Sequence, residues 1–295
     1  MLRGGGIYYK RILEKGENMK KQFLLIASSI FALSLTSCGG DSNAPQVDLE
    51  NKTVTYGLYP QKRILDSDTV LSDLKELTLD NIDDNSGWYL YKGEYYAKVI
   101  SSPMLGDGAV FENGDKIGDS NEYWFKCEPI TWKILASNED GYLITSEFLL
   151  DNGVYSAGSA ASSYYEQSNV REYLNSTFLE IAFFKDKGEN ILTTKVDNSN
   201  NITPNGNYDF SSDDIDDKVF VLSYNDLLNN EYGFSSENNE NNGRKDLVTD
   251  YARAKGAIFN KEGFGTYWTR SPDRNKNSYV YNVNYEGVME STHRY

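Results

Sequence analysis

A hairpin signal in the middle of the chain constrains the fold more than any other feature. Residues 130–137 and 142–147 are rich in aromatic and branched aliphatic side chains, and Asn138-Glu139-Asp140-Gly141 lies between them. Asn, Asp and Gly accept the backbone conformations of a tight turn. Two strands joined by so short a turn must pair antiparallel. We therefore expect an antiparallel sheet, to which residues 123–127 add a separate strand.

Weaker strand signals occur on both sides of this hairpin. Residues 54–59 predict a strand that Pro60 closes, and residues 88–100 predict a hairpin that turns at Lys92-Gly93. A short buried strand is expected over 219–222. The chain closes with β structure over 267–271, 278–284 and 287–289.

Helices and loops separate these strands. Ser67-Asp68 and Ser168 can each cap a helix, because they precede apolar residues at helical spacing, and a further helix is expected over 247–255. Long polar segments predict loops over 101–120, 151–166, 196–217 and 235–243. The pattern indicates one α+β domain over 51–295, with an antiparallel sheet, short helices and long polar loops.

The N-terminal region carries an export signal that begins at Met19. Lys20 and Lys21 precede an apolar stretch of 13 residues over 23–35, and small residues follow it. This order of charge, apolar core and small residues is typical of a secretory signal. The stretch is shorter than the roughly 20 residues of a membrane-spanning helix. The alternative is a short buried helix.

The residues that follow, Leu35-Thr36-Ser37-Cys38, resemble the lipobox of bacterial lipoproteins. The resemblance implies that Cys38 is acylated and becomes the new N-terminus, with membrane lipid as its partner. Acyl chains would then hold the protein on the extracellular face of the cell membrane. On this interpretation residues 1–18 are an extension ahead of the true start, 19–37 the signal peptide and 38–50 a tether.

Charge and histidine content exclude several functions. The chain has a net charge of −15, and loss of the basic signal would make it more negative, so binding to nucleic acid is not expected. The only histidine is His293, two residues from the end. Ser-His-Asp, Cys-His and multi-histidine zinc sites all require a well-placed imidazole. We therefore expect no catalytic residues, no resident metal and no cofactor.

Six segments in order support a family resemblance. They resemble a family of uncharacterised bacterial extracellular domains found in surface proteins and lipoproteins. That family is distantly similar to the C-type-lectin-like fold of lectins and formylglycine-generating enzymes, which implies a fold more than an activity. Its members usually end in Gly-(Val/Ile)-Arg-Pro-Ala-Leu, which is missing here, so a degraded paralogue stays open. The segments are Tyr56-Gly57-Leu58-Tyr59-Pro60-Gln61, Tyr123-Trp124-Phe125, Pro129-Ile130-Thr131-Trp132-Lys133-Ile134-Leu135, Val170-Arg171-Glu172-Tyr173-Leu174-Asn175, Lys218-Val219-Phe220-Val221-Leu222-Ser223 and Trp268-Thr269-Arg270-Ser271-Pro272.

Four residues are candidates for ligand binding: Trp268, Arg270, Tyr89 and Tyr91. Aromatic rings could stack on a sugar or line a protein interface, and Arg270 could clamp a ligand. For Trp132 and Trp268, core packing is the preferred role, and for Arg270 hydrogen bonding to loop carbonyls or a carboxylate.

Two other features have a functional and a plainer interpretation. The run Asp213-Asp214-Ile215-Asp216-Asp217 could supply oxygen ligands to Ca²⁺ or be a solvated loop. Cys127 could be an oxidative-enzyme cysteine, as the resemblance to formylglycine enzymes would suggest. Those catalytic sites use a cysteine pair, so a buried inert thiol is the preferred interpretation.

The sequence favours a non-enzymatic surface domain that binds a carbohydrate, peptide or protein. The alternatives are a cell-envelope enzyme, either a carboxylate-based hydrolase or a relative of the formylglycine enzymes, and an inactive paralogue. A pair of carboxylates in a cleft would favour the hydrolase, and an aromatic surface would favour binding.

Overall fold

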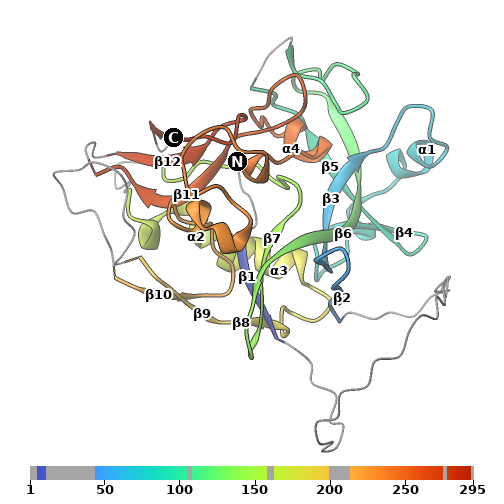
Figure 1. Ribbon diagram of the computed structural model, residues 1–295. Coiled ribbons are helices and arrows are strands. Elements are labelled where there is room, and N and C mark those ends of the chain that lie inside the picture. Colours follow the sequence, from blue (N-terminus) through green and yellow to red (C-terminus); the bar gives the residue numbers. More distant parts are fainter. Residues whose placement is uncertain are drawn as a thin grey trace, which may run out of the picture.

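One long strand, β6 (Glu122–Ser137), organises the main sheet of the protein (Figure 1). The computed structural model describes residues 44–104, 108–157, 163–198, 213–274 and 278–293, and the backbone of residues 5–10. One edge of β6 pairs with β3, and the opposite edge pairs with β5 at its start and with β7 at its end, all antiparallel. The antiparallel sheet is therefore confirmed. Its other strands are β1 (Gly5–Lys10), β2 (Gln46–Asp48), β3 (Thr53–Arg63), β4 (Tyr89–Tyr91), β5 (Glu94–Ile100), β7 (Gly141–Ser146) and β8 (Ile191–Leu192).

Two prolines lie inside strands: Pro60, which was expected to close a strand, and Pro129, which was left between two predicted strands. β3 continues through Pro60, and β6 joins the two strands predicted on either side of Pro129. Pro60 lies opposite Cys127 and Pro129 opposite Leu58, and the register shifts next to both pairs. Proline cannot donate to the ladder, but a bulge tolerates it. The predicted strand ends were wrong for this reason.

Two smaller sheets lie beside the main one. A three-stranded antiparallel sheet contains β11, β12 and β13, which correspond to the three β segments predicted at the end of the chain. A two-stranded pair, β9 with β10, forms at the two ends of the segment 196–217, which was expected to be entirely loop. The bounds are β9 (Thr194–Val196), β10 (Ile215–Asp217), β11 (Tyr267–Pro272), β12 (Tyr279–Val283) and β13 (Met289–His293).

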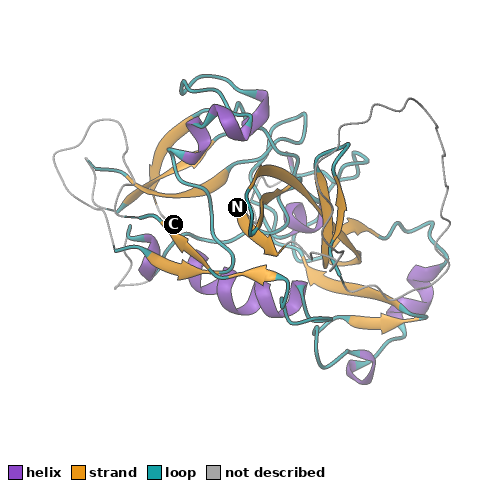
Figure 2. Ribbon diagram, turned by 60° about the horizontal axis from the view of Figure 1, so that its bottom comes forward, coloured by secondary structure: helices purple, strands orange, loops and turns teal. Residues whose placement is uncertain are grey.

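The helices are short and lie scattered among strands and loops (Figure 2). The predicted cap at Ser168 is confirmed, because its hydroxyl accepts from the Arg171 backbone N–H at 3.2 Å. The predicted cap at Asp68 was wrong: its carboxylate accepts from the Leu65 N–H at 2.7 Å, and the helix begins after Thr69. The helices are α1 (Val70–Lys75), α2 (Asn169–Tyr173), the π-helical turn η4 (Leu174–Phe178), α3 (Leu179–Ala182) and α4 (Asp250–Ala254), with 3₁₀ turns η1 (Leu79–Asn81), η3 (Tyr165–Gln167), η5 (Asp226–Leu228), η6 (Asn230–Tyr232) and η7 (Asn242–Arg244).

Residues 219–222 are buried as expected, but they form no strand. Their polar backbone groups are bonded by other means. The Asn175 side chain bonds both the N–H and the carbonyl of Val219, and Arg270 bonds the carbonyls of Val221 and Leu222. Side chains and one backbone N–H thus replace a sheet partner, as buried backbone groups require.

Aromatic packing holds the domain together, and Trp132 occupies its centre. The Trp132 side chain is fully buried, and its indole N–H donates to the Tyr56 carbonyl at 2.8 Å, which confirms the core role predicted for it. A smaller cluster under α1 contains Leu71, Leu74 and Trp124. Together these elements form a single α+β domain. Within the described residues no helix is long and apolar enough to cross a membrane.

Candidate functional site

A surface pocket lies on the three-stranded sheet beside Trp268. The ladder places Trp268 on β11 directly opposite Asn282 on β12, so both side chains lie on the same face of the sheet. The pocket has a volume of about 220 Å³. We call it the Trp268 pocket; its lining includes Met104, Asn152, Gly153, Val154, Gly256, Ile258, Trp268, Asn282, Thr292 and His293.

The Trp268 ring forms the floor of this pocket. Its side chain is 8% exposed, the indole N–H donates to the Gly153 carbonyl at 2.9 Å, and the ring packs edge to face on Tyr155. The predicted core role of Trp268 is therefore confirmed, and its edge still lines the pocket. A ring held this tightly presents a fixed wall and not an open stacking platform.

The rim of the Trp268 pocket is apolar and comes from three separate loops. Met104, Val154 and Ile258 are all exposed, Met104 by 67%. The loops are tied together, because the Ser102 N–H bonds the Ala254 carbonyl and the Asn152 side chain bonds the Lys255 carbonyl. Exposed apolar side chains gathered around a concavity are typical of a binding site.

One residue that lines the pocket carries an unsatisfied polar atom. Asn282 is buried, and its Oδ1 atom has no hydrogen-bond partner in the part of the chain that the structure describes. A buried polar group normally has a partner, and an exception requires an explanation.

The other predicted binding residues lie elsewhere. Arg270 is buried and bonds the Val221 carbonyl at 2.9 Å and the Asp226 carboxylate at 2.7 Å, as the structural interpretation predicted. Tyr89 packs edge to face on Trp124 in the smaller core cluster, and the Tyr91 hydroxyl donates to Asp73. Figure 1 shows their strand, β4, on the opposite side of the molecule from β11. The four predicted residues are therefore not brought together.

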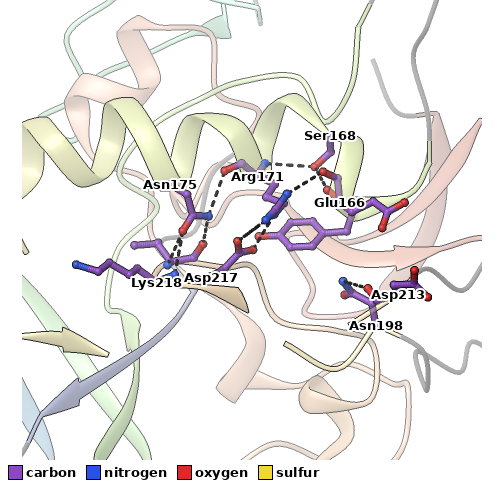
Figure 3. A network of polar contacts seen from close by, with 10 residues as sticks. Glu166, Ser168, Arg171, Asn175, Asn198, Asp213, Asp217 and Lys218 are labelled. Carbon is purple, nitrogen blue, oxygen red and sulfur yellow. Dashed lines mark hydrogen bonds and ion pairs between the residues drawn. The ribbon is translucent and has the colours of Figure 1, made fainter. Parts of the chain in front are cut away.

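The acidic run considered for Ca²⁺ is divided among separate partners (Figure 3). Arg171 donates hydrogen bonds to the Asp217 carboxylate from Nε and Nη2, at 3.0 and 2.8 Å. Asp214 accepts from the Asn198 N–H and pairs with Lys195. Burial raises the pKa of Asp217 more than Arg171 lowers it. Within the described residues no group of three or more His, Cys, Asp or Glu is arranged for a metal.

Of the two predicted cysteine features, the structure places Cys127 and not Cys38. Cys127 is a free, buried thiol whose pKa is raised by burial, as expected for an inert cysteine. Cys38 and the signal segment lie outside the described residues.

A second, charged cleft lies beside α4, with a volume of about 420 Å³. Asp250 and Arg253 line it, and Glu112 and Glu262 add further carboxylates. Asp250 accepts from the Glu112 N–H at 2.7 Å, and burial raises its pKa. A carboxyl with a raised pKa in a cleft is a candidate for acid chemistry.

Sequence reasoning found only Trp268 among the pocket residues. Asn282, Met104 and Ile258 carry no local signal, because their role arises from loops that are far apart in the sequence. The alternation in residues 278–284 was the only indication that Asn282 lies on one face of a strand.

The fold is a mixed α+β domain with a surface pocket lined by Trp268. A family model described as "Domain of unknown function (DUF6273)" matches residues 139–295, which is more than half of the chain. The protein therefore belongs to this family of uncharacterised domains, and the match includes β7, α4 and the three-stranded sheet. No curated protein and no solved structure matches the chain.

Proposed function

We propose that this protein is a surface lipoprotein whose domain binds a peptide or protein through the Trp268 pocket, without catalysis. The observation that carries the proposal is a pocket with an apolar rim, one of whose lining residues, Asn282, has a buried and unsatisfied Oδ1. Such a site suits an apolar side chain next to an N–H or O–H donor. Pockets for small molecules are usually about 300–1,000 Å³. A volume of about 220 Å³ fits one side chain better than a whole cofactor.

The geometry favours a peptide over a stacked sugar. A sugar ring needs an open aromatic face, whereas the Trp268 ring is held in the floor. The acidic surface of the chain, with a net charge of −15, further favours a ligand with cationic residues beside its apolar anchor.

The test is selection of peptides from a displayed random library on the full chain. Ile258→Glu places a charge on the rim and should abolish retention of the selected peptides, and Asn282→Ala should weaken binding at least severalfold. Leu79→Glu is the matched control, because Leu79 is exposed in η1, outside the pocket. Equal retention by wild type and Ile258→Glu would contradict the proposal. A glycan array, with and without Ca²⁺, tests the carbohydrate alternative.

Membrane attachment through acylated Cys38 is part of the proposal. It is supported by the lipobox-like residues and the preceding apolar stretch. Metabolic labelling with a fatty-acid analogue should mark the wild type and not Cys38→Ala. A C-type-lectin-like fold is likewise proposed from the ordered segments named above, and an experimental structure compared with lectin domains would test it.

A second candidate function is carboxylate-based hydrolysis in the Asp250 cleft. The raised pKa of Asp250 favours it, since a general acid must hold its proton near the working pH. Release of soluble fragments from a cell-wall polymer by wild type, and not by Asp250→Asn, would support this enzyme and displace the binding role.

A further inference from the structure

Lys255 and Asp151 make an unusually close contact. The Lys255 Nζ lies 2.5 Å from the Asp151 Oδ1, whereas ion pairs of this kind usually measure about 2.7–2.9 Å. The Asp151 side chain is 2% exposed and that of Lys255 is 32% exposed. The contact joins the segment after β7 to the end of α4, which are far apart in the sequence.

The second carboxylate oxygen of Asp151 faces two phenols. Tyr59 and Tyr173 each donate to Oδ2 at 2.6 Å, and their own oxygens lie 2.8 Å apart. Burial raises the pKa of both tyrosines, so both stay protonated as donors. Two donors on one oxygen form the arrangement that stabilises an oxyanion on a carbonyl carbon.

Aromatic rings pack around the buried Asp151 end of this site. Tyr59 packs edge to face on Tyr251 and on Trp88, and the Lys255 ammonium lies 5.0 Å from the centre of the Tyr251 ring. The close contact gives the proton a direct route from Nζ to Oδ1.

We propose that Lys255 and Asp151 become joined by an isopeptide bond. After the proton moves to Oδ1, the neutral Nζ attacks Cγ, and the charge that develops on Oδ2 is held by Tyr59 and Tyr173. A second proton passes from Nζ to Oδ1, the Cγ–Oδ1 bond breaks, and one water molecule leaves. An ammonium and a carboxylate thus give one amide and one water, with no oxidation or reduction.

The product fits the same contacts. Oδ2 becomes the amide oxygen and keeps both tyrosine donors, and the nitrogen takes the place of Oδ1. The Asn152 N–H, which donates to Oδ1 at 2.7 Å, assists departure of that oxygen. The bond would close a loop of about one hundred residues in a chain whose described cysteine, Cys127, is free. Cross-links over long loops stabilise by restricting the unfolded chain.

The chain contains a matched control pair. Lys133 lies 3.4 Å from Asp246, whose side chain is fully buried, so burial of the acid is similar. The Lys133 Nζ and Asp246 Oδ1 atoms are farther apart than the 2.5 Å between Lys255 and Asp151. Lys126 and Glu94 lie closer, at 2.9 Å, but both are well exposed. Of the lysine–carboxylate pairs in the described part of the chain, Lys255 and Asp151 are the closest, and Asp151 is buried and accepts from two phenols.

Peptide mapping of the purified full chain tests the proposal. After denaturation and proteolysis, mass spectrometry should find a branched peptide that contains Asp151 and Lys255 and is one water lighter than its two parts. Lys133 and Asp246 should occur only in linear peptides. Lys255→Arg keeps the positive charge but cannot condense, so the branched peptide should be lost and the thermal midpoint lowered. If wild-type protein, kept folded at several pH values, yields only linear peptides, the contact is an ion pair and the proposal is wrong.

A second variant tests the role of the phenols. Tyr173→Phe removes one donor from Oδ2 and leaves the ring in place, so the branched fraction should form several times more slowly than in wild type. An unchanged rate in a folded Tyr173→Phe protein would overturn the role assigned to that hydroxyl. None of these outcomes depends on ligand binding, so the bond and the proposed function succeed or fail separately.

Discussion

Arg244 is expected to be among the most important single residues for stability. Its side chain is fully buried and donates to five backbone carbonyls at 2.7–3.1 Å. Among the residues that the structure describes, Arg244 forms no ion pair with a carboxylate, and these hydrogen bonds all go to carbonyl dipoles. Burial lowers the pKa of Arg244, but arginine ordinarily stays charged. The carbonyls belong to Leu227, Ser235, Glu237, Asn239 and Gly287.

The magnitude follows from the two carbonyls that are bonded in buried surroundings, those of Leu227 and Gly287. A buried acceptor left without a partner costs about 1–3 kcal/mol, so Arg244→Met should lose roughly 2–6 kcal/mol of unfolding free energy. The other three carbonyls lie in an exposed segment and can turn to water. Domains are stable by only about 5–15 kcal/mol, so the effect is large.

Urea unfolding, followed by tryptophan fluorescence, measures the loss. Arg244→Lys should also lose at least about 2 kcal/mol, because an ammonium offers three donors at one point and cannot reach carbonyls in five directions. Lys261→Met is the control for removal of a positive charge, since Lys261 is exposed. A loss below about 1 kcal/mol in Arg244→Met, with an unchanged urea dependence, would refute the reasoning.

Two further predictions concern Asp250 and Gly57. Burial raises the pKa of Asp250, so ionisation of its carboxyl lowers the stability of the fold as pH rises from the unfolded pKa of about 3.9 through the raised folded pKa. Urea unfolding at pH 4 to 7 should therefore show Asp250→Asn gaining stability relative to wild type across that window. Asp80→Asn, at an exposed position, should show no such gain. Gly57 has φ +80°, and a Cβ there would lie 2.7 Å from the Phe183 ring. Gly57→Ala should therefore lower the free energy of unfolding by at least about 1–2 kcal/mol in the same assay. Gly93→Ala, with φ +82° and open space around the Cβ, should lower it by less.

Local signals predicted the elements whose geometry is fixed by neighbouring residues. The turn at Lys92-Gly93 forms as expected, with φ of 50° and 82°, because glycine and a hairpin between strands specify it. Ser168 caps its helix through a bond that spans three residues. The strand ends near Pro60 and Pro129 were predicted wrongly because a bulge that tolerates proline depends on the partner strand, which local sequence does not reveal.

The sites could not be predicted, because they depend on contacts between distant segments. Residues 235–243 have the composition of a solvated loop, yet the carbonyls of Ser235, Glu237 and Asn239 turn inward to Arg244. Asn282 becomes a pocket residue only when its strand pairs with that of Trp268. A hydrophobic pattern reports which side chains are buried and leaves open which polar atoms will face them.

The strand β1 and the predicted signal peptide make opposite demands on the N-terminus. β1 pairs with both β7 and β8, so residues 5–10 belong to the main sheet. Cleavage before Cys38, which we propose, would remove that strand and leave the edge of β7 unpaired. A single molecule cannot both lose residues 1–37 and keep β1 in the sheet. An unpaired edge recruits another strand. We therefore expect protein from the membrane fraction to begin at Cys38 and to associate through β7, and a Thr145→Pro change, which places a proline opposite Gly5 in the ladder, to reduce that association. N-terminal peptide mapping decides the first point: recovery of residues 5–10 in the membrane-bound protein would show that β1 is retained and that cleavage at Cys38 does not occur.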